Sequence, residues 1–183
     1  INSDANYDEK FWAHVHEEAT DNEAVVTVKT KKLDFYYTSN IATFVETAHN
    51  KVPVKTTQTR NKYAETIYQA PLKQDETLTI YKYAANVTNR DHDIDALQHV
   101  AATRLAEAMS KGFMTLKSDQ KEAWEKKWLD SDIVIEGDVS AQQGIRFNIF
   151  QMNQTYTGED ARLNIGPKGF TGEKYGGSTY WDT

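Results

Sequence analysis

Alternating apolar and polar positions predict β-strands in the first half of the chain. Residues 24–29 are rich in β-branched side chains. In residues 78–84, Leu78, Ile80, Lys82 and Ala84 alternate with Thr79, Tyr81 and Tyr83. Further strands are expected over 33–37, 41–45 and 63–70. About five strands with no helix to cover them leave a broad apolar face in water. We therefore expect that a part of the protein that covers this face is absent upstream.

The hydrophobic period becomes helical after residues 89–95. We expect Asp91 or Asp93 to cap a helix there and Gly112 to end it. Its apolar residues recur at intervals of three and four: Ile94, Leu97, Ala101, Leu105 and Ala108. One face of this helix is therefore predicted to pack against another element.

A second helix is predicted over residues 113–129. The residues that share its apolar face are Phe113, Leu116, Ala123, Trp124 and Trp128. The two tryptophans are four residues apart, so they lie along one face and bury much apolar area. A core or inter-domain anchor is the favoured interpretation, because the rest of this helix is rich in Lys and Glu. A sugar-stacking platform is the alternative.

A third helix is predicted over residues 139–156, with Asp138 or Ser140 as its cap and Gly158 as its stop. Its apolar stripe has intervals of four, four, three and four: Ala141, Ile145, Ile149, Met152 and Tyr156. This spacing favours packing within a helical domain.

Charge and composition exclude several classes of protein. The formal net charge is -6 and the basic residues are scattered, which argues against a nucleic-acid partner. The densest basic set, Lys29, Lys31 and Lys32, fits a solvated turn. No apolar run approaches the about 20 residues that span a bilayer, so no membrane partner is expected.

The cellular location predicted from the sequence is cytoplasmic. The first residues carry neither the basic nor the apolar part of a signal peptide. The chain has no cysteine, which excludes disulfides and cysteine-bound metals and fits a reducing compartment.

Several familiar site patterns fail on spacing. The glycines of residues 169–174 match neither a P-loop nor a dinucleotide fingerprint. His14 and His16 are two apart, a spacing that would place both on one side of a strand and make them a candidate metal pair, but no third ligand can be identified. Asp91, Asp93 and Asp95 alternate as in a calcium loop, but no glycine follows at the required position, so capping is the better interpretation.

The C-terminal stretch is the best candidate for a binding site. Five of the nine glycines lie in residues 166–183, where they permit unusual backbone angles and close approach to a ligand. Trp181 supplies an aromatic face and Asp182 a carboxylate, the two groups that a sugar site requires. Adjacent residues of an extended segment point to opposite sides, so both face one ligand only where the backbone bends.

Residues 135–183 closely resemble the disaccharide phosphorylases of glycoside hydrolase family 65. The family pattern is a glycine-rich G-x-x-G-E-x-Y-x-G stretch followed by an aromatic residue and W-D-T-E, of which the final glutamate is not part of this sequence. The matching residues are Gly169, Gly172, Glu173, Tyr175, Gly177, Tyr180, Trp181, Asp182 and Thr183. Ser178, Thr179 and Tyr180 are similar to the maltose-specific branch of the family. A weaker resemblance extends back to Tyr7, Phe11 and Trp12, and thus over most of the chain.

The resemblance implies an α+β piece of a larger enzyme. Residues 1–90 would form antiparallel strands of an N-terminal β-sandwich, and residues 91–137 a helical linker. Residues 138–183 would begin an (α/α)6 catalytic barrel and include a substrate-binding loop.

The resemblance also implies an inverting phosphorolysis of maltose to β-glucose 1-phosphate and glucose. Trp181 and Asp182, with Tyr180 and Gly177, would bind the transferred glucosyl unit, and Glu173 would be structural. Phosphate is the co-substrate, and no metal or organic cofactor is implied. The general acid and the phosphate-binding residues would lie downstream, so these 183 residues alone should be inactive. Family members are commonly homodimers.

The sequence is also compatible with three alternatives. The first is another linkage within the same family, trehalose or kojibiose. The second is a carbohydrate-binding β-domain without catalysis, with a stacking surface formed by Tyr36, Tyr37, Tyr63 and Tyr68. The third is a purely structural or interaction module.

Overall fold

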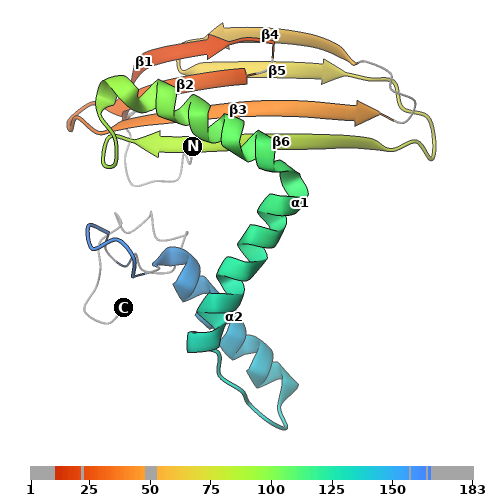
Figure 1. The fold of residues 1–183 in the computed structure, drawn as a ribbon, viewed down its shortest axis with the longest axis vertical. Helices are drawn as coiled ribbons and strands as arrows, with labels where there is room; N and C mark the ends of the chain where they lie inside the picture. Colours follow the sequence, from red (N-terminus) through yellow and green to blue (C-terminus); the bar gives the residue numbers. More distant parts are fainter. Residues whose placement is uncertain (1–10, 22, 48–52, 157, 164, 166–183) are drawn as a thin grey trace. The chain divides into compact units, whose positions relative to one another are not determined.

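The structure is a computed structural model, and it describes residues 11–21, 23–47, 53–156, 158–163 and 165. Antiparallel strands come first along the chain and helices follow, so the architecture is α+β as the sequence predicts (Figure 1). The described residues belong to two compact units, which divide between Lys117 and Ser118.

A four-stranded antiparallel sheet makes up most of the first unit. Strand β3 (Tyr36–Thr47) lies between β2 (Glu23–Thr30) and β6 (Leu78–Thr88), and β1 (Trp12–Ala19) lies outside β2. The predicted strands at 24–29 and 78–84 are therefore confirmed as β2 and β6, and β6 is four residues longer than expected because it continues to Thr88.

The prediction of two separate strands at 33–37 and 41–45 is wrong. Residues 36–37 and 41–45 belong to the single strand β3, and residues 33–35 lie in the turn before it. Polar residues interrupt the apolar pattern in the middle of this strand, but the fold buries them. The hydroxyl of Thr38 lies 2.9 Å from that of Thr27 on β2, and both residues are buried. A satisfied polar pair can occupy a sheet interior. Leu33, by contrast, is 72% exposed.

Strands β4 (Val54–Arg60) and β5 (Tyr63–Gln69) form a separate hairpin. Of these two strands, only β5 was predicted from the sequence. The hairpin turn holds Lys62 at a φ of 59°. Its backbone N–H donates to the Glu17 carboxylate at 3.2 Å, and its ammonium group donates to the Trp12 carbonyl at 3.1 Å. Glu17 pairs with Val26 and lies on one face of the sheet, so the hairpin forms a second β layer on that face.

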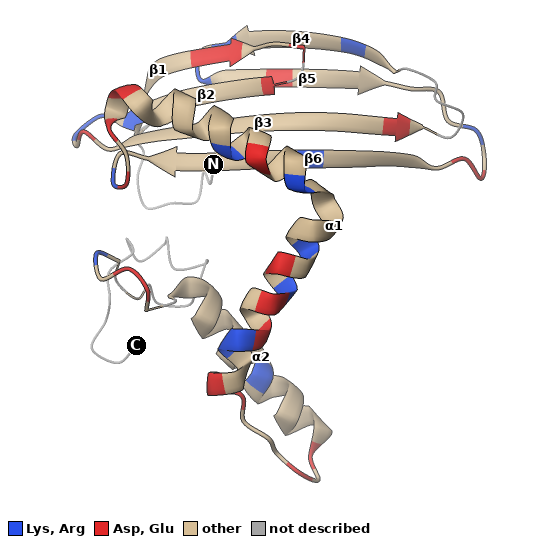
Figure 2. Cartoon of the chain, in the orientation of Figure 1, with Lys and Arg blue, Asp and Glu red and all other residues tan. Residues whose placement is uncertain are grey.

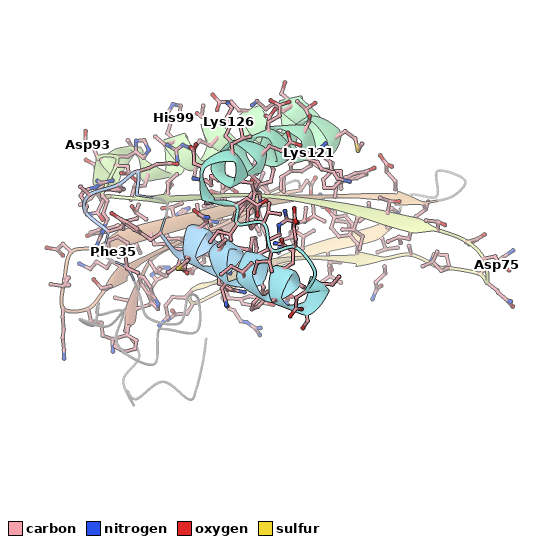
Figure 3. The ribbon with its side chains drawn as sticks, turned by 90° about the horizontal axis from the view of Figure 1, so that it is seen from below. Phe35, Asp75, Asp93, His99, Lys121 and Lys126 are labelled. Atoms are coloured by element: carbon pink, nitrogen blue, oxygen red, sulfur yellow. The ribbon has the colours of Figure 1, made fainter. Side chains whose placement is uncertain are left out.

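The opposite face of the sheet is covered by the part of helix α1 (Leu97–Ser131) that precedes Gly112, and this helix follows the short turn η1 (Ile94–Ala96) (Figure 3). The predicted stripe is buried at Leu97, Ala101 and Leu105. Its first member, Ile94, is 45% exposed and lies outside the core. Asp93 occupies the expected cap position but makes no side-chain capping bond.

Small residues let the helix approach the sheet closely. Leu105 packs on Ala42 of β3 and Ala85 of β6. Ala101 and Leu97 pack on Val87 of β6. Fully buried aliphatic side chains contribute about 1.5–3 kcal/mol each relative to exposed ones, so this seam stabilises the first unit.

The predicted break at Gly112 is confirmed. Its φ of 75° and ψ of 161° are not helical, so α1 is kinked at this residue and a second helical part continues to Ser131. This backbone region is open almost only to glycine. The first and second predicted helices therefore meet at this residue.

Candidate functional site

The four residues expected to bind substrate, Gly177, Tyr180, Trp181 and Asp182, lie outside the described residues, as does all of 166–183. The structure does describe the helices that precede this segment in the sequence. They are the part of α1 from Ser118 to Ser131 and helix α2 (Val139–Thr155), both in the second unit. Acidic and basic residues alternate along this part of α1, in contrast to the mainly uncharged first part (Figure 2).

An aromatic pair joins the two helices. The rings of Trp124 on α1 and Phe150 on α2 are 5.0 Å apart between centroids, at an interplanar angle of 34°. Such pairs stabilise by about 0.5–1.5 kcal/mol beyond the area they bury. The anchor interpretation of the tryptophans therefore holds for Trp124.

Hydrogen bonds fix the connection between the helices. The Asp138 carboxylate accepts from the backbone N–H of Ala141 at 2.9 Å, so the predicted cap of α2 is confirmed. The Gln142 amide donates to the Ile133 carbonyl at 2.9 Å and accepts from the Ile135 N–H at 2.6 Å. Both hydrogen-bonding functions of this one side chain thus bind the connecting backbone.

An ion pair reinforces the same connection. The Arg146 guanidinium donates to both carboxylate oxygens of Asp132, at 2.8 and 2.6 Å. This contact lowers the pKa of Asp132 and raises that of Arg146, mainly through the hydrogen bonds between them. Two hydrogen bonds from one planar guanidinium group to one carboxylate restrict the orientation of α2 more than a single ionic contact would.

The chain leaves α2 through a second set of polar contacts. Helix α2 ends at Thr155 with Tyr156 as an extended C-cap, so the predicted stop at Gly158 is wrong, although Gly158 does have a φ of 78°. The Lys127 ammonium lies 3.0 Å from the Glu159 carboxylate, and Asp160 accepts hydrogen bonds from the backbone and guanidinium of Arg162. These contacts fix the last described residues before the glycine-rich stretch.

The predicted apolar stripe of α2 is wrong for one residue, Met152. Ile149 is buried and Ala141 and Ile145 are half-buried, but Met152 is 66% exposed. Phe150, which the stripe omitted, makes the contact with α1.

The two histidines considered as a metal pair lie on opposite faces of β1. A β-bulge at Val15 makes His14 pair with Val28 and His16 with the adjacent Thr27. His14 contacts the Glu17 carboxylate, whereas His16 lies 3.6 Å from Glu18. Among the described residues, no group of three or more His, Asp or Glu side chains could hold a metal ion.

The four tyrosines considered as a stacking surface do not share a face. Tyr36 packs under α1 beside Val87, while its neighbour Tyr37 lies on the other face and contacts Trp12. Tyr63 and Tyr68, five residues apart on β5, also point to opposite sides. The structure therefore does not bring them together.

An open groove in the first unit was not predicted from the sequence. It has a volume of about 450 Å³ and lies between β3, β6 and the backbone around Gly112. Aromatic rings of three elements line it: Phe44, Tyr81, Tyr83 and Phe113. The alternation of tyrosines at positions 81 and 83 was the only available signal. We call this feature the aromatic groove.

Among the described residues, no helix is both long and apolar enough to cross a membrane.

Comparison with known families gives two matches along the chain. Residues 1–127 match the N-terminal domain of glycosyl hydrolase family 65. Residues 146–183 match the central catalytic domain of the same family. The second match includes the whole glycine-rich stretch and the four predicted substrate-binding residues.

Individual relatives agree with these matches. Maltose phosphorylase of Bacillus subtilis (strain 168) is 39% identical over 188 residues, covering 100% of this chain and 24% of the relative. Alpha,alpha-trehalose phosphorylase of Thermoanaerobacter brockii is 33% identical over 158 residues, covering 86% of this chain and 20% of the relative. The chain thus spans about a quarter or less of the length of these curated relatives.

A solved structure has the same fold. A putative kojibiose phosphorylase from the human microbiome superimposes with a TM-score of 0.75 at 32% identity. The match covers 94% of this chain and 22% of that protein.

Proposed function

Because the chain belongs to glycosyl hydrolase family 65, we propose that it is part of an inverting disaccharide phosphorylase that cleaves maltose with inorganic phosphate. The observation that carries the proposal is the 39% identity over the whole chain to a maltose phosphorylase. The Ser178-Thr179-Tyr180 sequence, similar to the maltose-specific branch, supports the choice of substrate.

In the proposed reaction, a phosphate oxygen attacks the anomeric carbon from the face opposite the leaving glucose. The bond from that carbon to the bridging oxygen breaks, and a carboxylic acid protonates the bridging oxygen. The products are β-glucose 1-phosphate and glucose. One acid is enough, because phosphate is already an anionic nucleophile at neutral pH and needs no general base.

The proposed role of this chain is to bind the glucosyl unit that is transferred. The Trp181 ring would form a wall of the pocket, and the Asp182 carboxylate would accept hydrogen bonds from ring hydroxyls. Tyr180 would extend the aromatic wall, and Gly177 would let the backbone approach the sugar. The contacts of α2 with the end of α1 support this role, because they fix the segment that leads into residues 166–183.

The domain division proposed from the sequence places residues 1–90 in the N-terminal sandwich, 91–137 in the linker and 138–183 in the catalytic barrel. The general acid and the phosphate site would be supplied by a longer protein that contains this chain. Homodimer formation, a cytoplasmic location and the absence of a metal or organic cofactor are part of the same proposal.

The decisive experiment measures phosphate-dependent sugar cleavage by such a longer protein. Maltose, trehalose and kojibiose are each supplied with phosphate, and glucose 1-phosphate is quantified with its anomeric form. Release of the β-anomer from maltose supports the proposal. Release from trehalose or kojibiose alone would keep the family and overturn the substrate, which matters because relatives include enzymes named for both sugars.

Two variants then test the residue roles. Asp182→Asn should lower kcat/KM about 10- to 100-fold, since a hydrogen bond to a charged group contributes about 1.5–3 kcal/mol. Glu173→Gln is the matched control and should leave kcat/KM unchanged, because Glu173 is expected to be structural. Equal losses in both variants would remove the assignment of Asp182.

A further inference from the structure

The aromatic groove is built by residues that are far apart in the sequence. Phe44 on β3 pairs in register with Tyr81 on β6, so both side chains lie on the same face of the sheet. Phe44 and Tyr83 form an edge-to-face pair with centroids 6.1 Å apart. This geometry is the preferred one for aromatic rings and holds them in place.

The break at Gly112 brings a further ring to this face. Because the backbone leaves the helical path there, Phe113 packs against Tyr81 with centroids 6.2 Å apart and an interplanar angle of 58°. Phe113 is nevertheless 52% exposed, and Met114 next to it is 72% exposed. The groove therefore presents apolar surface that the described residues do not cover.

Polar groups stand among these rings. Within the described part of the chain, neither the Tyr81 nor the Tyr83 hydroxyl is hydrogen bonded to another protein group, and the same is true of the Glu46 carboxylate. Two hydroxyls can donate or accept, and a carboxylate accepts only. The groove thus combines aromatic faces with three unpaired hydrogen-bonding groups.

We propose that the aromatic groove binds a glucosyl unit of an α-linked oligosaccharide. One face of a glucose ring presents C–H groups that pack on aromatic rings, and its hydroxyls can pair with Glu46 and the two phenols. The groove volume of about 450 Å³ lies in the range of small-molecule sites. The choice of a glucosaccharide as ligand rests on the proposed function.

The same groups disfavour an apolar polypeptide as the occupant. An apolar segment, or the apolar face of a second copy of this chain, would cover the Glu46 carboxylate and both hydroxyls and would itself offer them no hydrogen-bonding group. Burying polar groups in this way is costly, most of all for a charge. A ligand rich in hydroxyls avoids that cost.

The test is an NMR titration of this chain with maltose and maltotriose. Aromatic signals of Phe44, Tyr81 and Phe113 should shift in a saturable way, with a dissociation constant on the order of 1 mM. Phe113→Ala should weaken this binding about tenfold, because an aromatic contact is lost. Phe147→Ala is the matched control, since Phe147 is a similarly exposed phenylalanine on α2, and it should leave the constant unchanged.

Three outcomes would overturn the proposal. The first is an absence of sugar-dependent shifts at the groove, and the second is equal affinity in Phe113→Ala and the unsubstituted chain. The third is self-association in sedimentation that Phe113→Ala abolishes, which would make a second copy the occupant.

Failure of this proposal is distinguishable from failure of the proposed function. Signals from residues 166–183 report on the proposed C-terminal sugar site during the same titration. In the longer protein, phosphorolysis without sugar binding at the groove would reject the groove alone. Sugar binding at the groove without phosphorolysis would reject the catalytic proposal alone.

Discussion

The guanidinium group of Arg146 holds both carboxylate oxygens of Asp132, with nitrogen–oxygen distances of 2.8 and 2.6 Å. Asp132 comes directly after α1, and Arg146 lies in the second turn of α2. The pair therefore joins the end of one helix to the body of the next.

The pH dependence of this pair follows from the lowered pKa of Asp132. Its folded pKa lies below the unfolded value of about 3.9, so the stabilisation is present above that pH and is lost as the pH falls through the folded pKa. Carboxyl NMR titration should show Asp132 ionising at unusually low pH. Arg146→Lys keeps the charge but loses the fork, and should return the Asp132 pKa toward its ordinary value. An unchanged titration in that variant would contradict the assignment.

The seam between α1 and the sheet should be sensitive to loss of volume. Leu105→Ala removes a fully buried side chain that packs on Ala42 and Ala85, so we expect a loss of about 2–5 kcal/mol in unfolding free energy. Leu129→Ala, at a position 84% exposed, should change it by less than about 0.5 kcal/mol. Urea unfolding followed by circular dichroism measures both variants, and similar midpoints would refute the packing argument.

Substitution by alanine should change the unfolding free energy in opposite directions at two glycines. At Gly112 a Cβ meets no atom within 4 Å, but the backbone region is unfavourable for alanine, so Gly112→Ala should cost about 1–3 kcal/mol. Gly144 lies inside α2, with no positive φ and similarly open space, so Gly144→Ala should stabilise by about 0.5–1 kcal/mol. Thermal unfolding distinguishes the two. Equal shifts would indicate that the α1 break does not depend on glycine.

The hydroxyl of Tyr68 should hold the hairpin to the sheet. It donates to the Thr43 carbonyl at 2.6 Å, so Tyr68→Phe should cost about 1 kcal/mol. Tyr63→Phe is the control, because its hydroxyl donates to the Glu65 side chain of the same strand and not to the sheet residue Thr43, and little change is expected. Chemical denaturation of the two variants provides the comparison.

Burial raises the pKa of Tyr68, which gives the hairpin its own pH dependence. Its contribution to stability is fully present below the unfolded pKa of about 10 and is lost as the pH rises through the folded pKa. Ultraviolet titration of the phenolates should lose, in Tyr68→Phe, one component that ionises above the ordinary tyrosine pKa, whereas the component of Tyr63, whose pKa is raised mainly by its hydrogen bond to Glu65, should remain. Retention of both components would assign the first to another tyrosine.

The sequence correctly predicted those features that depend on helical periodicity or on a single glycine or capping residue. The helix stripe from Leu97 to Leu105, the break at Gly112 and the Asp138 cap are local signals, and each is present in the structure. The strands that the sequence missed are β1, in which half of the residues are polar, and β4, in which every residue except Val54 is polar, and the faces of both strands are only partly covered. Their pairing partners, rather than their own apolar content, make them strands.

The two candidate binding sites, the C-terminal motif and the aromatic groove, also differ in how far the sequence could predict them. A linear motif could single out Trp181 and Asp182, because their spacing relative to the glycines lies within one segment. The aromatic groove joins Phe44, Tyr81 and Phe113 across three elements. Its assembly depends on sheet register and on one backbone angle, neither of which a local pattern specifies.

The bulge at Val15 also determines how the chain can vary in length. Val15 lies outside the pairing ladder, so Trp12 and Glu17 are on the same side of β1, although they are five positions apart and would face opposite sides in a regular strand. Deleting Val15 would leave the partners of all other β1 residues as they are. Deletion of Val15 should therefore leave the structure of the strand unchanged. Deletion of another β1 residue would shift the register, so that the side chains on one side of the deletion face the opposite side of the sheet.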